Sequence, residues 1–264
     1  MAFSLRLLES RRFITLVLLG ALAWSAYNIN WSEPIVHSGG GSSFVSLLKS
    51  LFTPELSPSF LKLALEATWV TIAYAVAGIS IAVPIGLSLG LVASGVLTKP
   101  GAQRRVVMVA TRLFLAVIRS IHELVWALLF VAALGLSPMA GILALGITYG
   151  GILGRIYADI INDVPDAPLK ALRSSGASEW KVLLYGRLPL ALSDMLSYTF
   201  YRFECAVRAA AVLGFVGLGG LGLEIQLSLD DLFFDEVWTL LYFLVGIIIL
   251  VDLWSSALRK RLVS

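Results

Sequence analysis

Two long stretches without any charged residue set the strongest constraint on how this chain can fold. Residues 67–98 and 124–154 contain no Asp, Glu, Lys or Arg. A helix needs about 20 predominantly apolar residues to cross a bilayer, so each stretch is long enough to do so. The whole chain is 58% hydrophobic and 14% charged, which is more apolar surface than one soluble core can bury. We therefore predict an all-α membrane protein.

Six transmembrane helices are expected. Residues 67–98 form one long span that Pro84 can kink. Residues 124–154 form a hairpin of two spans, because Gly-Leu-Ser-Pro at 135–138 is typical of a tight turn. An even number of spans places both termini on the same side of the membrane. The three remaining spans cover residues 13–27, 190–215 and 237–258.

The first of these segments allows a second interpretation. Arg11 and Arg12 precede a short apolar stretch that contains Ala-Leu-Ala at 21–23, as in a signal peptide with its cleavage site. An uncleaved helix and a cleaved signal peptide therefore both remain open. The predicted domains are an N-terminal helix (1–31), an outer linker (32–62), a membrane core (63–258) and a tail (259–264).

Basic residues are distributed unevenly between the two predicted faces. Of the 20 Lys and Arg residues, fifteen fall in segments that share one face, and only Lys49 and Lys62 fall on the other. Short cytoplasmic loops are enriched in basic residues, so this distribution predicts that both termini are cytoplasmic. The net charge of +3 is explained by this topology, and no nucleic-acid partner is expected. Membrane lipid is the expected surrounding.

The longest basic loop, within residues 155–189, has an internal pattern. Pro168 opens a helical stretch, residues 174–176 (Ser-Ser-Gly) break it, and a second stretch follows at 177–185. Gly176 allows the backbone to reverse, and Pro189 suits the start of the next span. An ordinary basic loop remains the alternative to an element that a partner protein grips.

This loop resembles that of the permease subunits of ABC importers. Their pattern is Glu-Ala-Ala, three residues, Gly, nine residues, Ile, one residue, Leu-Pro. The spacing is the same here, while Lys170, Leu172 and Gly186 depart from it. The resemblance implies a type I (MetI-like) fold whose coupling loop, at about 162–189, docks on an ATPase subunit. The positions assigned to that coupling are Lys170, Ala171, Gly176, Leu188 and Pro189.

A first polar stripe is predicted where the third span begins. Arg119, His122, Glu123 and Trp126 follow helical spacing, which would place them on one face. Ionisable groups at membrane depth usually face a cavity or each other, so we assign all four to the substrate path. The alternative is an interfacial anchor in which Arg119 pairs with Glu123.

A second stripe lies on the fifth span. Tyr201, Glu204, Cys205 and Arg208 share a face, and Glu204 precedes Arg208 in the favourable pairing order. Arg202 points nearly the opposite way. We assign Tyr201, Glu204 and Arg208 to the substrate path, because a guanidinium fork suits phosphate-type oxyanions. A purely structural ion pair remains the alternative.

Glycines crowd the segment after Arg208. The run at 217–222 matches Gly-x-Gly-x-x-Gly, but it follows a membrane span rather than a strand, so a dinucleotide site is not expected. Irregular backbone at this depth must be buried in protein or line a cavity. We expect a gate or a packing turn formed by Gly214, Gly217, Gly219, Gly220 and Gly222.

Much of the chain from about residue 67 onward is similar to the phosphonate-permease branch of ABC importers. The similarity rests on Tyr-Arg-Phe-Glu at 201–204, on the glycine run, and on the segments 119–131 and 183–189. It implies a non-catalytic subunit of an importer for a small phosphorus oxyanion in a bacterial plasma membrane. The implied partners are a second copy of the chain, two ATPase subunits that bind ATP and Mg, and an extracytoplasmic substrate-binding protein.

Other functions are weighed against this one. No phosphate-binding loop of the Gly-x-x-x-x-Gly-Lys-Ser/Thr type occurs in the sequence, so no cofactor of its own is expected. One Cys and two His cannot build a closed His/Cys metal site, so we expect no metal. A permease for another small solute and an ion-coupled carrier using Glu123 and Glu204 remain alternatives. An intramembrane enzyme ranks last, because no catalytic constellation is present.

Overall fold

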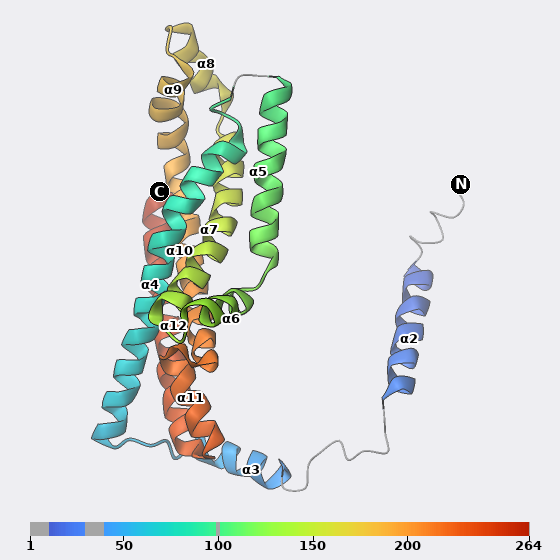
Figure 1. Ribbon diagram of the computed structural model, residues 1–264, viewed down its shortest axis with the longest axis vertical. Coiled ribbons are helices and arrows are strands. Elements are labelled where there is room, and N and C mark those ends of the chain that lie inside the picture. The colour runs from blue at the N-terminus through green and yellow to red at the C-terminus, as the bar shows by residue number, and fades with distance from the viewer. Residues whose placement is uncertain (1–10, 30–39, 99–100, 264) are drawn as a thin grey trace. The chain divides into compact units, whose positions relative to one another are not determined.

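The computed structural model describes residues 11–29, 40–98 and 101–263, and within these ranges it contains helices and no strand. The chain divides into two units, residues 1–49 and 50–264. The first contains α2 (Arg11–Asn28) and most of α3 (Gly40–Ser50), and the second contains a helical bundle (Figure 1). The expected boundary at 31–32 lies outside the described residues, as do Arg6, His37 and Lys99.

The bundle begins with α4 (Pro58–Ser94), α5 (Ala102–Ser120), α6 (Glu123–Leu134) and α7 (Pro138–Asp163). The connection to the next long helix consists of α8 (Asp166–Ser174), α9 (Glu179–Val182) and a π-helical turn, η1 (Leu183–Arg187). After this connection the bundle continues with α10 (Leu188–Leu213), a second π-helical turn, η2 (Gly214–Leu218), α11 (Leu221–Asp230) and α12 (Phe234–Val263). We call the end of the bundle that carries α8, α9 and η1 the loop end.

Length and composition qualify several helices as membrane spans. Among the described residues, α4, α7 and α12 qualify singly. Two further pairs qualify if each pair is one broken span. The first is α5 with α6, bent by 83°, and the second is the continuous helix of residues 179–218, which contains α10, with α11, bent by 53°. The apolar helix of residues 13–28 is shorter than a span requires, so three to five spans qualify against the six predicted. The predicted all-α membrane architecture is confirmed.

The prediction for the third span was wrong in its boundaries. A single helix was expected to begin near Arg119, but the chain turns sharply where Ile121 is extended (φ −91°, ψ 123°). His122 caps the new helix, because its Nδ1 accepts a hydrogen bond from the Leu124 amide at 3.2 Å. Arg112, one of the fifteen basic residues placed on the cytoplasmic face, lies inside α5, where Asp159 of α7 pairs with it at 3.5 Å. Helix α5 was therefore missed, because its charged residues were read as belonging to a loop.

Other boundaries shifted less. The tight turn predicted at 135–138 is confirmed, since it separates α6 from α7. Helix α4 begins at Pro58 instead of residue 67, because the exposed pair of Lys62 and Glu66 fits on a helix surface. Helix α7 extends past residue 154 to Asp163. An absence of charge therefore underestimates helix length where charged residues can reach solvent or a partner.

Small residues bring α4 and α7 together as parallel neighbours (Figure 1). A Cβ atom added at Gly86 would lie 2.7 Å from Cβ of Leu153, and one at Gly150 would lie 2.8 Å from Cγ2 of Ile85. Neither position has room for a side chain, so the two backbones approach closely. This contact is the centre of the bundle on which the candidate site is built.

Candidate functional site

The paired charges on α10 form the first part of the candidate site. Because α10 is continuous from Leu188 to Leu213, Glu204 and Arg208 lie one turn apart on the same face. Arg208 Nη2 donates to Glu204 Oε1 at 2.6 Å. The Glu204 side chain is only 11% exposed, whereas that of Arg208 is 49% exposed. The carboxylate is therefore held inside the protein, and the guanidinium can still be reached by a ligand.

Arg202 has different partners. Its Nε donates to the Tyr198 hydroxyl at 2.9 Å, and its guanidinium lies 5.0 Å from the Tyr198 ring centre and 5.2 Å from that of Tyr201. Cation–π contact of this kind stabilises an arginine where water is scarce. Tyr201, which we assigned to the path with Glu204 and Arg208, therefore contacts Arg202.

The corner between α5 and α6 contains the other predicted stripe. The stripe does not share one helix face, because Arg119 ends α5 while Glu123 and Trp126 belong to α6. Trp126 Nε1 donates to the Ile118 carbonyl at 3.2 Å and so ties the two helices together across the bend. His122 Nε2 lies 3.9 Å from Glu123 Oε1. Within the described ranges Arg119 has no ion-pair partner, so the pair with Glu123 that the alternative, an interfacial anchor, requires is not formed.

Tyr149 of α7 lies near charges of both predicted stripes, and sequence reasoning missed it. This tyrosine is 4% exposed. Its hydroxyl interacts electrostatically with Glu123 of the corner and with Arg202 and Arg208 of α10. In the sequence it is a single tyrosine beside glycines in an uncharged stretch, and no periodic pattern of polar residues singles it out. The charges predicted from two separate stripes are thus near one buried phenol.

The glycine run forms a packed break rather than a regular helix. Gly217, Gly219 and Gly220 adopt positive φ angles of 83°, 92° and 78°, which side chains rarely allow. The Tyr74 hydroxyl of α4 donates to the Leu218 carbonyl at 2.5 Å. Thr71 of α4 accepts a hydrogen bond from the Leu221 amide at 3.0 Å. Backbone groups freed by the break are therefore satisfied by α4, as a packing turn requires.

The two remaining glycines of this run lie where chain segments touch. A Cβ atom on Gly222 would fall 1.9 Å from the Ala211 carbonyl oxygen, and one on Gly214 would fall 2.5 Å from the Leu223 amide nitrogen. Beside this contact is a mostly apolar cavity of about 340 Å³, lined by Arg208 and by residues of α10, α11 and α12. The glycine turn therefore lies next to the exposed guanidinium.

The loop between α7 and α10 contains a break between two helices, as predicted. Helix α8 begins at Asp166, two residues before Pro168, and Gly176 ends it with a φ of 81°. Lys170, Ala171 and Gly176 are exposed. Trp180 is 60% exposed although it lies in a polar loop, and motif spacing did not single it out. Leu188 and Pro189 begin α10 without a gap after η1.

Two departures from the importer pattern explain each other. Leu172 replaces an alanine of the pattern and Gly186 replaces its isoleucine. A Cβ atom on Gly186 would lie 2.9 Å from side-chain atoms of both Leu169 and Leu172. The larger residue on α8 therefore fills the space that the smaller one on η1 leaves. Side-chain volume lost on η1 is thus replaced by side-chain volume gained on α8.

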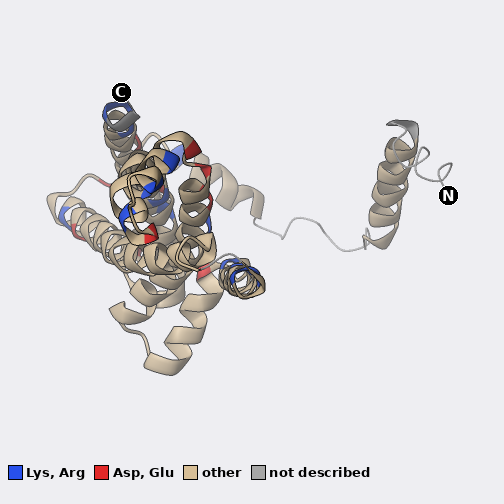
Figure 2. Ribbon diagram, turned by 90° about the horizontal axis from the view of Figure 1, so that it is seen from above, with Lys and Arg blue, Asp and Glu red and all other residues tan. Residues whose placement is uncertain are grey.

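Basic residues gather at the loop end of the bundle (Figure 2). Arg173 of α8 forms two hydrogen bonds to Glu179 of α9, at 2.9 and 3.1 Å, which close the turn at Gly176. The bond from Arg173 lowers the pKa of the Glu179 carboxyl, so this carboxylate stays charged at neutral pH. In the part of the chain that the structure describes, no group of three His, Cys, Asp or Glu residues could hold a metal ion.

The structure combines a bundle of apolar helices, charged residues on two of them near the core, and an exposed helical loop at the basic end. These features are typical of membrane transport permeases. The chain belongs to the family of binding-protein-dependent transport system inner membrane components, whose model matches residues 83–264. It is accordingly a multi-pass inner-membrane protein.

Three relatives show where in this family the chain lies. The phosphite transport system permease protein PtxC of Stutzerimonas stutzeri is 34% identical over 232 residues, which cover 83% of each chain. The putative phosphite transport system permease protein HtxC of the same organism is 31% identical, covering 95% of this chain and 87% of the relative. The phosphate-import permease protein PhnE of Mycolicibacterium smegmatis is 32% identical, covering 81% of this chain and 40% of the relative.

Solved structures show the same fold at lower identity. A chain of the MetNI methionine ABC transporter in an inward-facing conformation superimposes with a TM-score of 0.69 at 18% identity, covering 78% of this chain and 99% of that one. An amino acid ABC transporter gives a TM-score of 0.66 at 18% identity, covering 77% and 95%. The predicted type I permease fold is confirmed by these neighbours.

Proposed function

We propose that this chain is the membrane subunit of an ATP-driven importer for a small phosphorus oxyanion, such as phosphite, phosphonate or phosphate. The observation that carries the proposal is the similarity, over more than four fifths of the chain, to relatives named as phosphite and phosphate permeases. The exposed guanidinium of Arg208 beside a buried carboxylate is chemically compatible with an oxyanion.

The assembly we propose contains two copies of this chain, two ATPase subunits and an outer substrate-binding protein. ATP and Mg bind to the ATPase subunits, which dock on the loop from Lys170 to Pro189. The exposed Trp180 supports this docking, because a large aromatic side chain in a polar loop is typical of an interface anchor. Both termini and the loop end face the cytoplasm, in keeping with the basic residues gathered there.

Within the membrane, Arg208 attracts the oxyanion and Glu204 competes with it for the same guanidinium. When the oxyanion arrives, it replaces the carboxylate as the acceptor, and when it leaves, the 2.6 Å ion pair forms again. This exchange keeps affinity modest, because release regains an ion pair. Arg119, Glu123, His122 and Trp126 at the corner of α5 and α6, with Tyr201, complete the proposed path.

Substrate uptake tests this function directly. The chain is reconstituted in proteoliposomes with candidate ATPase and binding-protein subunits from the same organism, and uptake of phosphite, methylphosphonate, phosphate, sulfate and methionine is compared. We expect ATP-dependent uptake of at least one phosphorus oxyanion and not of sulfate. Uptake of methionine or another amino acid, with none of the phosphorus compounds transported, would contradict the proposal.

A further inference from the structure

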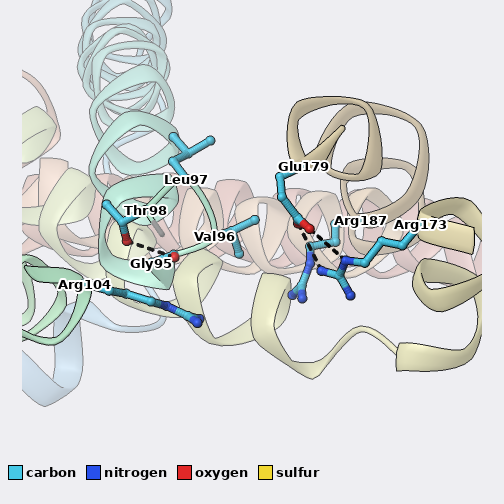
Figure 3. A pocket seen from close by; sticks show the side chains of 8 residues that line it. All are labelled: Gly95, Val96, Leu97, Thr98, Arg104, Arg173, Glu179 and Arg187. Carbon is cyan, nitrogen blue, oxygen red and sulfur yellow. Dashed lines mark hydrogen bonds and ion pairs between the residues drawn. The ribbon is translucent and has the colours of Figure 1, made fainter. Parts of the chain in front are cut away.

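A second cavity lies at the loop end, outside the proposed path (Figure 3). Its volume is about 450 Å³. Residues 95–98, which follow α4 and begin the connection to α5, form one side, and Arg104 reaches in from α5. The other side is formed by Arg173, Glu179 and Arg187, which belong to the loop between α7 and α10.

The cavity carries uncompensated positive charge. Of its three arginines, Arg173 is neutralised by Glu179 through the two hydrogen bonds at 2.9 and 3.1 Å. Neither Arg104 nor Arg187 forms an ion pair with any described residue. Asp166 is the other carboxylate that acts electrostatically on Arg187, and it forms no ion pair with it. Two guanidinium groups therefore face the cavity without a matching anion.

Both of these guanidinium groups also contain a donor without an acceptor. Nε of Arg104 and Nε of Arg187 are buried and have no hydrogen-bond partner among the described residues. Arg187 uses its Nη1 on the Ile161 carbonyl at 2.9 Å, and the Thr98 hydroxyl donates to the Gly95 carbonyl at 3.1 Å. Because the two Nε atoms are enclosed by protein, a ligand in the cavity would be held by the terminal nitrogens of the two guanidinium groups.

We propose that this cavity binds a phosphate-type oxyanion between Arg104 and Arg187. A tetrahedral group with several charged oxygens can accept bidentate hydrogen bonds from two guanidinium forks at once. Two sources present this chemistry: free inorganic phosphate and the headgroup of an anionic phospholipid. Figure 3 shows Arg104 on one side of the cavity and Arg173 and Arg187 on the other.

The bound anion would connect two elements of the chain. Arg104 belongs to α5, and Arg187 ends η1, so an oxyanion held by both fixes the loop relative to the start of α5. Under the proposed function, this loop is where the ATPase subunits dock, and this consequence rests on that function. The anion site itself does not, because binding can be measured without transport.

The test uses the full-length chain purified without ATPase subunits, so that no nucleotide site contributes. In detergent, the midpoint of thermal unfolding is measured at increasing concentrations of inorganic phosphate. Sodium chloride at matched ionic strength is the reference. In lipid nanodiscs, native mass spectrometry compares retention of phosphatidylglycerol with that of phosphatidylcholine. We expect a saturable rise in the midpoint with phosphate, or selective retention of phosphatidylglycerol, and either outcome identifies the source.

Matched variants locate the site. Arg104→Gln is expected to weaken binding at least about tenfold, since it removes a charged donor. Arg105→Gln removes the same charge from the exposed neighbouring residue and is expected to leave binding unchanged. All variants are compared in the Arg208→Gln background, so that phosphate held in the proposed path does not contribute. Equal weakening by Arg104→Gln and Arg105→Gln, or no saturable binding of either probe in this background, would overturn the proposal.

Discussion

Under the proposed function, Arg208 serves transport through a guanidinium that is half exposed, while its carboxylate partner Glu204 is largely buried. The sequence predicted the Glu204–Arg208 pair from helical spacing, and the 2.6 Å contact confirms it. Spacing could not predict that Tyr149 would approach the same charges, because that proximity depends on how α7 packs against α10.

Replacing Arg208 tests its role in the path. Arg208→Gln should lower uptake of the phosphorus oxyanion at least about tenfold, since one charge-assisted hydrogen bond is worth about 1.5–3 kcal/mol. Uptake and protein level are measured in the same proteoliposomes. Arg202→Gln removes the same charge from α10, where it stacks on tyrosines, and should cause a smaller loss at equal protein level. Equal losses in both variants would remove Arg208 from the path.

Gly222 tests the glycine turn. Gly222→Ala places a Cβ atom 1.9 Å from the Ala211 carbonyl oxygen and should destabilise the protein by about 1–3 kcal/mol. The control is Gly246→Ala in α12, where nothing lies within 4 Å of the added atom and helix propensity favours alanine by about 1 kcal/mol. Thermal unfolding in detergent compares the two. A Gly222→Ala midpoint equal to that of the unmodified chain would contradict this tight contact.

At the scale of single elements, the predictions held where one local signal decided the outcome. The prediction of a turn at 135–138 was correct, because Gly and Pro specify it locally. The corner at Ile121 was missed, because neither Gly nor Pro marks it and the Trp126 bond to Ile118 comes from the folded arrangement. The stripe at the third span failed for the same reason, since helical spacing has meaning only within one continuous helix.

The exchange of sizes between α8 and η1 can be tested by restoring the family pattern. Gly186→Ile alone should destabilise the chain through its contacts with Leu169 and Leu172, and Leu172→Ala alone should leave a void. The double variant should recover part of both losses, with a coupling of about 0.5–3 kcal/mol. Thermal midpoints of the four proteins give this coupling. Strictly additive losses would mean that the two positions do not compensate.

On the scale of the whole molecule, the class of protein followed from the sequence more securely than its geometry did. The uncharged stretches and the loop spacing predicted a helical permease, and the family match from residue 83 to the end confirms it. Composition could not predict the bend of 83° between α5 and α6 or the parallel packing of α4 on α7. Both depend on side chains meeting across long separations in the sequence.

The energy source of uptake tests the central claim most directly, because it separates an ATP-driven importer from an ion-coupled carrier that would use Glu123 and Glu204. Proteoliposomes containing the chain, an ATPase and a binding protein carry an imposed proton gradient. The phosphorus oxyanion is supplied outside, and the ATPase side contains either ATP or no nucleotide. We predict uptake that requires ATP and continues when an ionophore abolishes the proton gradient. Uptake without ATP that stops when the gradient is abolished would contradict the account.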